Sequence, residues 1–246
     1  NHEPAGPASP FKSALFLNGD TPLAGAIRTF LLSRGLKLAV YSQAAPEGSA
    51  PPHASPGAPD GARRYGPADA GPLSEACLQH ILDDFGPVDL VIHDLGTGTV
   101  SPPREDGSGG QRLEANLRGA LDLAPHLEAK MAEFGRGRIL YLAPWAWDVH
   151  VDSLWYQSVK TGTASLAKAM ARRLSASRVT VNCLIPGFVG GLIPLGARSS
   201  AGVPEFGKRL KRDVEISELL KLVGFLLSED SQCLTGQVLE TGGLNG

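Results

Sequence analysis

Cysteine is scarce in this chain of 246 residues: there are three, Cys77, Cys183 and Cys233, odd in number and far apart. Such usage argues against a disulfide framework and for a reducing compartment. The six histidines form no cluster with cysteines or carboxylates at metal-ligand spacing. We therefore expect no metal site.

An excess of charge of one sign and a long apolar run are also missing. With 23 basic and 25 acidic residues the formal net charge is −2, which argues against a nucleic-acid-binding protein. No uninterrupted apolar run reaches the length of about 18 residues that a membrane helix needs. Residues 1–10 have neither a basic region nor an apolar core, so we expect no signal peptide. These absences predict a cytoplasmic protein that binds neither nucleic acid nor membranes.

The chain does contain a regular alternation of short β-rich runs and longer amphipathic stretches. The runs predict strands at Ser13–Leu17, Leu36–Tyr41, Val88–His93, Arg138–Leu142, Thr180–Ile185 and Val238–Glu240. The stretches predict helices at about Leu23–Ser33, Leu73–Phe85, Gln111–Phe134, Leu154–Ser175 and Ile216–Leu227. Apolar strands separated by helices imply a parallel sheet covered on both faces. We predict one α/β domain with a doubly wound, Rossmann-type sheet and ligands at the carboxyl ends of its strands.

One segment interrupts this alternation. Between Ala44 and Pro72, Ala, Pro and Gly make up 20 of 29 residues, and the prolines forbid a regular helix. We interpret residues 44–72 as an irregular exposed loop within a domain spanning 13–246; a proline-rich docking motif is the alternative. Residues 1–12 are interpreted as an N-terminal extension.

Tyr156 and Lys160 are the first residues that indicate chemistry. Positions i and i+4 of a helix lie on one face, so the two side chains project together. A nearby cation lowers the pKa of a phenol, which makes tyrosine a usable general acid or base. An ordinary surface pair is the alternative for this spacing alone.

Several sequence blocks surround this pair in a characteristic order. They are Val88–Gly96, Asn116–Gly119, Tyr156–Leu166, Arg178–Val189 and Leu234–Gly243. In this order and spacing they resemble the short-chain dehydrogenase/reductase family, especially its 3-oxoacyl-acyl-carrier-protein-reductase-like branch. The resemblance extends from about Ser13 to the end of the sequence.

The resemblance implies roles for single residues. Tyr156 would be the general acid that protonates a carbonyl oxygen, Lys160 would lower its pKa and hold the nicotinamide ribose, and Asn116 would position a water molecule. Contacts with NAD or NADP would come from Gly19, Asp69, Gly96, Lys160, Pro186 and Gly187.

The chain also departs from the family pattern at positions that matter for catalysis. The family serine that binds the substrate carbonyl is replaced by Ala143, and losing such a donor costs about 10²–10³ in rate. The glycine-rich turn reads Asn18-Gly19-Asp20-Thr21-Pro22-Leu23-Ala24-Gly25. One register places Pro22 and Ala24 at the second and third glycines, and the other places Leu23 and Gly25 there. Either register impairs the approach of a pyrophosphate.

Further departures affect the cofactor site. Asp20 and Asp94 add negative charge beside the expected phosphates. Gly191 replaces the threonine that usually contacts the carboxamide. After the second strand the chain offers neither an acid for NAD nor a base for NADP, although Arg63 and Arg64 could reach a 2′-phosphate from the irregular loop.

Two functions follow from this pattern. We expect a catalytically impaired short-chain dehydrogenase/reductase subunit that pairs with an active paralogue. The alternative is an active NAD(P)(H)-dependent reductase or dehydrogenase of a ketone or secondary alcohol, with a small-molecule or acyl substrate under a lid at 191–213. The resemblance implies dimers or tetramers formed through the long helices. The stripe Leu166, Ala167, Met170 and Leu174 serves either such an interface or packing on the sheet.

Overall fold

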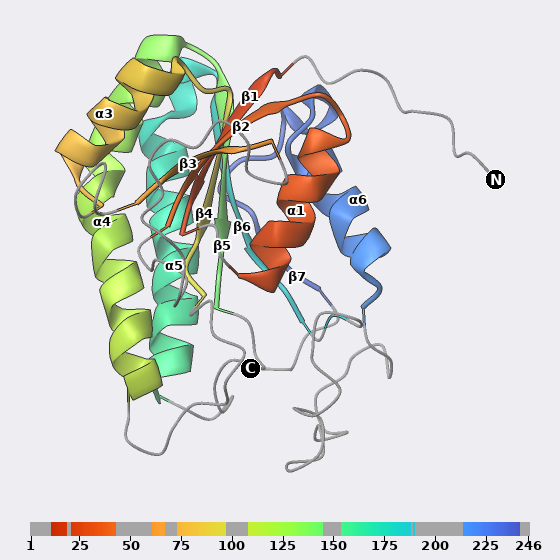
Figure 1. The fold of residues 1–246 in the computed structure, drawn as a ribbon. Coiled ribbons are helices and arrows are strands. Elements are labelled where there is room, and N and C mark those ends of the chain that lie inside the picture. Colours follow the sequence, from red (N-terminus) through yellow and green to blue (C-terminus); the bar gives the residue numbers. More distant parts are fainter. Residues whose placement is uncertain are drawn as a thin grey trace.

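Seven parallel strands form one sheet in the computed structural model, which describes residues 11–18, 21–42, 61–66, 73–96, 108–144, 154–187, 189 and 214–241. The strands are β1 (Ser13–Leu17), β2 (Lys37–Tyr41), β3 (Arg63–Tyr65), β4 (Leu90–Asp94), β5 (Gly137–Leu142), β6 (Val179–Ile185) and β7 (Val238–Glu240). Their order is β3-β2-β1-β4-β5-β6-β7 (Figure 1). The chain order reverses between β1 and β4, as in a doubly wound fold, so the predicted fold class is confirmed.

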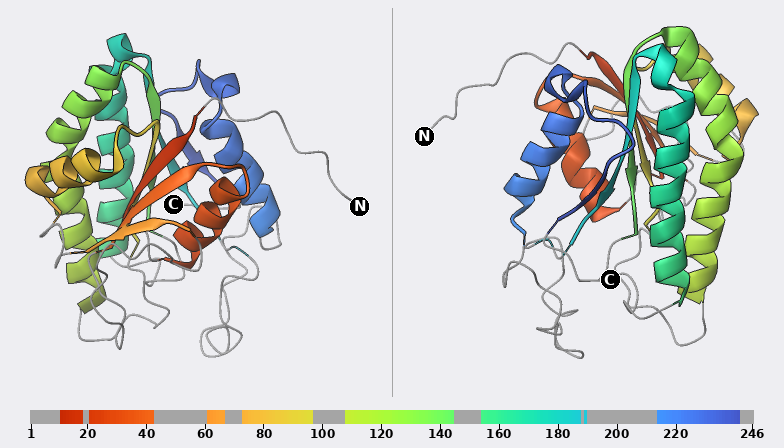
Figure 2. Two further views of the ribbon diagram at one scale, coloured as in Figure 1. Left: turned by 45° about the horizontal axis from the view of Figure 1, so that its top comes forward. Right: turned by 180° about the vertical axis from the view of Figure 1, so that it is seen from behind.

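Helices cover both faces of the sheet (Figures 1 and 2). One face carries α3 (Glu75–Phe85), α4 (Ser108–Phe134) and α5 (Leu154–Arg173), and the other carries α1 (Pro22–Leu32) and α6 (Ile216–Leu226). Short 3-10 helices lie at Ser175–Ser177 and Glu229–Ser231. Each face of the sheet packs into a separate apolar cluster, because neighbouring side chains of a strand point to opposite faces.

Local sequence explains where several helices begin. Thr21 caps α1 by accepting the Ala24 N–H at 3.0 Å, and Pro22 occupies the first turn, where its missing N–H costs nothing. Ser74 caps α3 in the same way through the Cys77 N–H. Glu215 and Glu218 form a capping box at the start of α6.

The structure corrects the interpretation of residues 44–72. Arg63–Tyr65 form strand β3 at the sheet edge, in parallel register with Ala39–Tyr41. The edge strand is held to α3 by Asp84, which accepts hydrogen bonds from Arg63 Nη2 at 2.5 Å and Tyr65 Oη at 2.7 Å. The sequence missed β3 because its pairing, and not its composition, makes it a strand.

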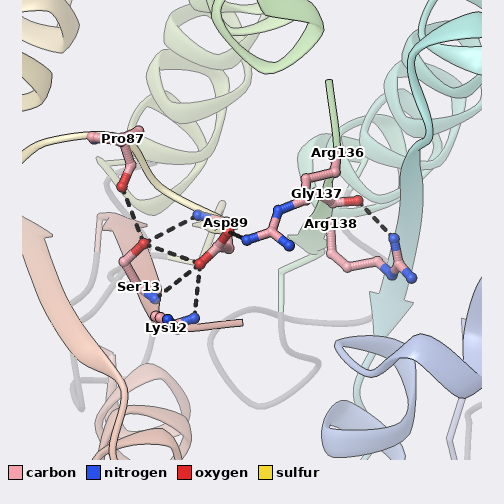
Figure 3. A network of polar contacts seen from close by, with 7 residues as sticks. All are labelled: Lys12, Ser13, Pro87, Asp89, Arg136, Gly137 and Arg138. Atoms are coloured by element: carbon pink, nitrogen blue, oxygen red, sulfur yellow. Dashed lines mark hydrogen bonds and ion pairs between the residues drawn. The ribbon is translucent and has the colours of Figure 1, made fainter. Parts of the chain in front are cut away.

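The amino ends of the strands are joined by a polar network (Figure 3). The Asp89 carboxylate accepts the Lys12 N–H at 2.7 Å and a bond from Arg136 Nη2 at 3.1 Å. Phe11 is buried, with the Arg138 guanidinium 5.1 Å from its ring centroid. Residues 11 and 12 therefore belong to the folded domain, not to an extension.

The apolar stripe on α5 packs inside the molecule. Leu166, Ala167, Met170 and Leu174 are all buried in the cluster between the helices and the sheet. Of the two roles considered for this stripe, packing on the sheet is confirmed, and the interface role is wrong for these side chains.

Candidate functional site

The predicted site residues that the structure describes meet at the carboxyl ends of β4, β5, β6 and β7. Gly96 follows β4, Ala143 follows β5, and Pro186 and Gly187 follow β6. The Ala143 N–H donates to the Leu184 carbonyl at 2.9 Å, and the Gly187 N–H donates to Thr241 Oγ1 at 3.2 Å. These bonds extend the sheet beyond its last regular pairs and fix the backbone of the site.

Asn116 joins helix α4 to this edge. Its Nδ2 donates to the Gly96 carbonyl at 2.7 Å and to the Leu95 carbonyl at 3.3 Å. The amide side chain is thus held beside the end of β4.

Lys160 reaches the same edge from α5. Its Nζ lies 2.6 Å from Glu240 Oε1, on β7, and the two side chains are only 13% and 26% exposed. Tyr156 is placed on α5 one turn before Lys160, and its side chain lies outside the described part of the structure. Glu240 was not among the predicted site residues, although it stands within the block that carries the resemblance.

Gly19, Asp69 and Gly191 also lie outside the described residues. Arg63 and Arg64 lie on strand β3 rather than on an irregular loop, and Arg63 is paired with Asp84. The prediction that both arginines extend from an irregular loop is therefore wrong.

The N-terminus of α1, where a doubly wound fold binds pyrophosphate, holds a carboxylate of the protein itself. Asp94, at the end of β4, is 3% exposed. Its Oδ2 accepts a short hydrogen bond from Thr21 Oγ1, and its Oδ1 accepts the Gly96 N–H at 2.8 Å. Helix N-termini attract anions through their partial positive charge and their unpaired N–H groups. In this chain the anion at the N-terminus of α1 is the Asp94 carboxylate.

Three of the described residues at this helix end offer no free backbone donor to a phosphate. Pro22 has no N–H, the Ala24 N–H is given to Thr21 Oγ1, and the Gly25 N–H is given to the Thr21 carbonyl at 2.9 Å. A second anion would also meet the charge of Asp94 in a water-poor setting. The described residues at this end of α1 therefore do not fit a dinucleotide pyrophosphate.

His93 and Tyr141 form a second feature that the sequence analysis did not predict. They are directly paired across β4 and β5, with ring centroids 5.7 Å apart, and are 1% and 0% exposed. Neither imidazole nitrogen of His93, nor the Tyr141 hydroxyl, has a hydrogen-bond partner among the described residues. Burial lowers the pKa of His93 to about 3 and raises the pKa of Tyr141 above its ordinary value.

Two further findings concern function classes. Within the described ranges, no group of three or more His, Cys, Asp or Glu side chains could hold a metal ion. None of the described helices combines the length and the apolar character needed to cross a membrane.

Comparison with known proteins adds family evidence to this geometry. Residues 69–245 match the family described as Enoyl-(Acyl carrier protein) reductase. The chain is 27% identical to the 3-oxoacyl-[acyl-carrier-protein] reductase MabA of Mycobacterium avium, over 86% of each chain. It is 26% identical to the (2S)-[(R)-hydroxy(phenyl)methyl]succinyl-CoA dehydrogenase subunit BbsD of Thauera aromatica, over 67% of this chain and 68% of that protein.

Solved structures agree in fold. The TT0495 protein of Thermus thermophilus matches with a TM-score of 0.67 and 23% identity, over 94% of this chain and 96% of that one. Acetoin dehydrogenase YohF of Salmonella typhimurium matches with a TM-score of 0.68 and 22% identity, over 95% and 96%. The family match covers well over half of the sequence, and the sheet order and the positions of Asn116 and Lys160 are consistent with it. The chain belongs to the short-chain dehydrogenase/reductase family, in its 3-oxoacyl-acyl-carrier-protein-reductase-like branch.

Proposed function

We propose that this chain is a short-chain dehydrogenase/reductase subunit with impaired dinucleotide binding, which assembles with an active paralogue in the cytoplasm. The observation that carries the proposal is the buried Asp94 carboxylate at the N-terminus of α1, bonded to Thr21 Oγ1 and the Gly96 N–H. The family pattern has an asparagine at this position, and its side chain carries no charge.

Ala143 supports the same proposal from the substrate side. Its methyl group cannot donate to a developing oxyanion, and its own N–H is occupied by the Leu184 carbonyl. Loss of one such donor costs about 10²–10³ in rate. An impaired phosphate site and a missing donor together leave little independent turnover.

A role as a subunit has a parallel among the relatives. BbsD is named as a subunit of a dehydrogenase. In this chain we assign the partner contact to the outer faces of α4 and α5, where Leu121 and Leu154 are 51% and 84% exposed. The apolar stripe of α5 described above is buried in the core and is not available for this contact.

Calorimetric titration of the purified chain with NADH and NADPH tests the proposal. We expect no binding of the wild-type chain up to about millimolar concentration, which corresponds to association weaker than about −4 kcal/mol. Asp94→Asn should bind measurably more tightly, because it removes the buried charge and keeps the shape of the side chain. Asp122→Asn, at an exposed position of α4, is the matched control and should change nothing.

Micromolar binding by the wild-type chain would overturn the proposal. It would favour the second candidate, an independent reductase or dehydrogenase acting on a ketone or secondary alcohol. The contact of Asn116 with the Gly96 carbonyl supports this candidate, because it keeps at the candidate site an asparagine to which the resemblance gives a role in the reaction. A screen of keto substrates, small or acyl-linked, with Tyr156→Phe as the inactive control, would then identify the reaction.

A further inference from the structure

An ion pair between Lys160 and Glu240 joins α5 to β7 at the carboxyl edge of the sheet. Lys160 Nζ and Glu240 Oε1 are 2.6 Å apart, and their side chains are 13% and 26% exposed. The pair Lys130–Glu133 on α4 is longer, at 3.5 Å, and its side chains are 32% and 68% exposed. Because water screens the inner pair less, its two charges offset each other more strongly.

The fold directs the Glu240 side chain toward α5. Neighbouring side chains of a strand point to opposite faces of the sheet. Val238 packs against the apolar cluster on the α5 face and Leu239 against the cluster on the α6 face, so Glu240 returns to the face that carries α5. Strand β7 is itself fixed by its parallel pairing with β6. The carboxylate is therefore presented to Lys160 by the sheet, and no ligand is needed to organise the pair.

Two features of the carboxyl edge attract anions, and a carboxylate of the protein already binds each of them. At the N-terminus of α1, the capping residue Thr21 is hydrogen-bonded to Asp94. On α5, the Lys160 ammonium is paired with Glu240. Helix N-termini and lysine ammonium groups are common partners of phosphate in proteins. An anionic ligand that approached Lys160 would have to displace Glu240 or bear its repulsion.

We infer that Glu240 is a specificity-determining residue: it occupies Lys160 and thereby excludes anionic groups, such as phosphate and carboxylate, from this end of the site. The inference deepens the proposed function and rests on it, because it adds a second internal anion to the Asp94 carboxylate at α1. It depends only on the described positions of Lys160 and Glu240 and does not require a bound dinucleotide.

Calorimetric titration with inorganic pyrophosphate tests the inference, because this probe carries the charge without the nucleosides. For the wild-type chain we expect a dissociation constant of about millimolar or above. Glu240→Gln should bind pyrophosphate about tenfold more tightly or better, because Lys160 then has no charged partner and the amide keeps the size of the side chain. An unchanged or weaker affinity in Glu240→Gln overturns the inference.

Two further variants assign the gain to Lys160. Lys160→Gln in the Glu240→Gln background should return the affinity to the wild-type level, and a gain that persisted there would contradict the inference. Glu133→Gln is the matched control, because it removes the same charge from the more exposed pair with Lys130. It should change the affinity less than about twofold. An equal gain in this control would show that net charge, and not Glu240, sets the affinity.

Glu240→Val keeps the test decisive if Glu240→Gln does not fold. Valine removes the carboxylate and suits a strand, so this variant should show the same gain, and a missing gain would overturn the inference. The outcome is separable from the NADH and NADPH titrations. Micromolar NADH binding by the wild-type chain would overturn the proposed function, whereas the comparison of pyrophosphate affinities between variants would still decide the role of Glu240.

Discussion

His93 is a buried histidine whose protonation the fold opposes. It is 1% exposed, its ring nitrogens have no partner among the described residues, and its neighbour Tyr141 is also buried. Burial lowers the pKa of His93 from 6.5 to about 3, because the charged imidazolium would lose its water. In the unfolded chain the same side chain binds a proton near its ordinary pKa.

The pH dependence of stability follows from this difference. The unfolded state binds more protons between pH 6.5 and about 3, so the free energy of unfolding falls as the pH falls through that window. From pH 7 to 5 the loss from His93 is about 2 kcal/mol. Urea unfolding at both pH values measures it. His93→Leu should remove most of this pH dependence, and an equal slope in wild type and variant would contradict the assignment.

At the scale of elements, the start of β5 depends on a glycine. Gly137 has φ +152°, and an added Cβ would lie 2.8 Å from the Asp89 carbonyl oxygen and would also clash with Met131 Cε. The backbone of β5 thus approaches both the segment before β4 and the end of α4. No side chain fits there without moving one of them.

Gly137→Ala should therefore lower the free energy of unfolding by about 2 kcal/mol or more. Gly119→Ala is the matched control within α4, because its Cβ would meet nothing within 4 Å. That variant should be stabilising by about 0.5–1 kcal/mol, since alanine is the better helix former. Chemical denaturation of both variants checks the prediction. If both variants changed the free energy of unfolding equally, the structure around Gly137 would have adjusted to the added methyl group without loss of stability.

At the scale of the whole molecule, the carboxyl and amino ends of the strands have different roles. The carboxyl edge carries the candidate site, and the amino edge carries the network around Asp89 (Figure 3). That carboxylate accepts bonds from the backbone at Lys12 and Ser13, from Ser13 Oγ, and from Arg136. It links the entry of β1 to β4 and β5.

Asp89→Ala should cost about 1–3 kcal/mol of stability, because it removes the acceptor for four hydrogen bonds, two of which, both from Ser13, are partly buried. The dinucleotide titrations should not change, since the network lies at the opposite edge of the sheet. Asp83→Ala, at an exposed position of α3, should be nearly neutral in both measurements. A changed dinucleotide affinity in Asp89→Ala would show that the two edges of the sheet are coupled.

The sequence alone predicted the element types, the parallel sheet and the family. These features rest on local periodicity and on short blocks of residues, so they can be recognised without long-range contacts. The same blocks singled out Asn116 and Lys160, whose side chains lie at the carboxyl edge of the sheet; their roles stay a prediction. Strand β3 was missed, since an edge strand of three residues is defined by its pairing with β2 and by the contact of Tyr65 with Asp84.

Only the tertiary structure decided which charges meet. Thr21 and Asp94 are 73 residues apart in the chain, and Lys160 and Glu240 are 80 apart. The sequence indicated extra acid near the cofactor site, but the burial of Asp94 at the end of α1 and the choice of Glu240 as partner of Lys160 depend on which strands lie side by side. Partner choice is set by the packing of the sheet and its helices, whereas helix and strand patterns are set by neighbouring residues.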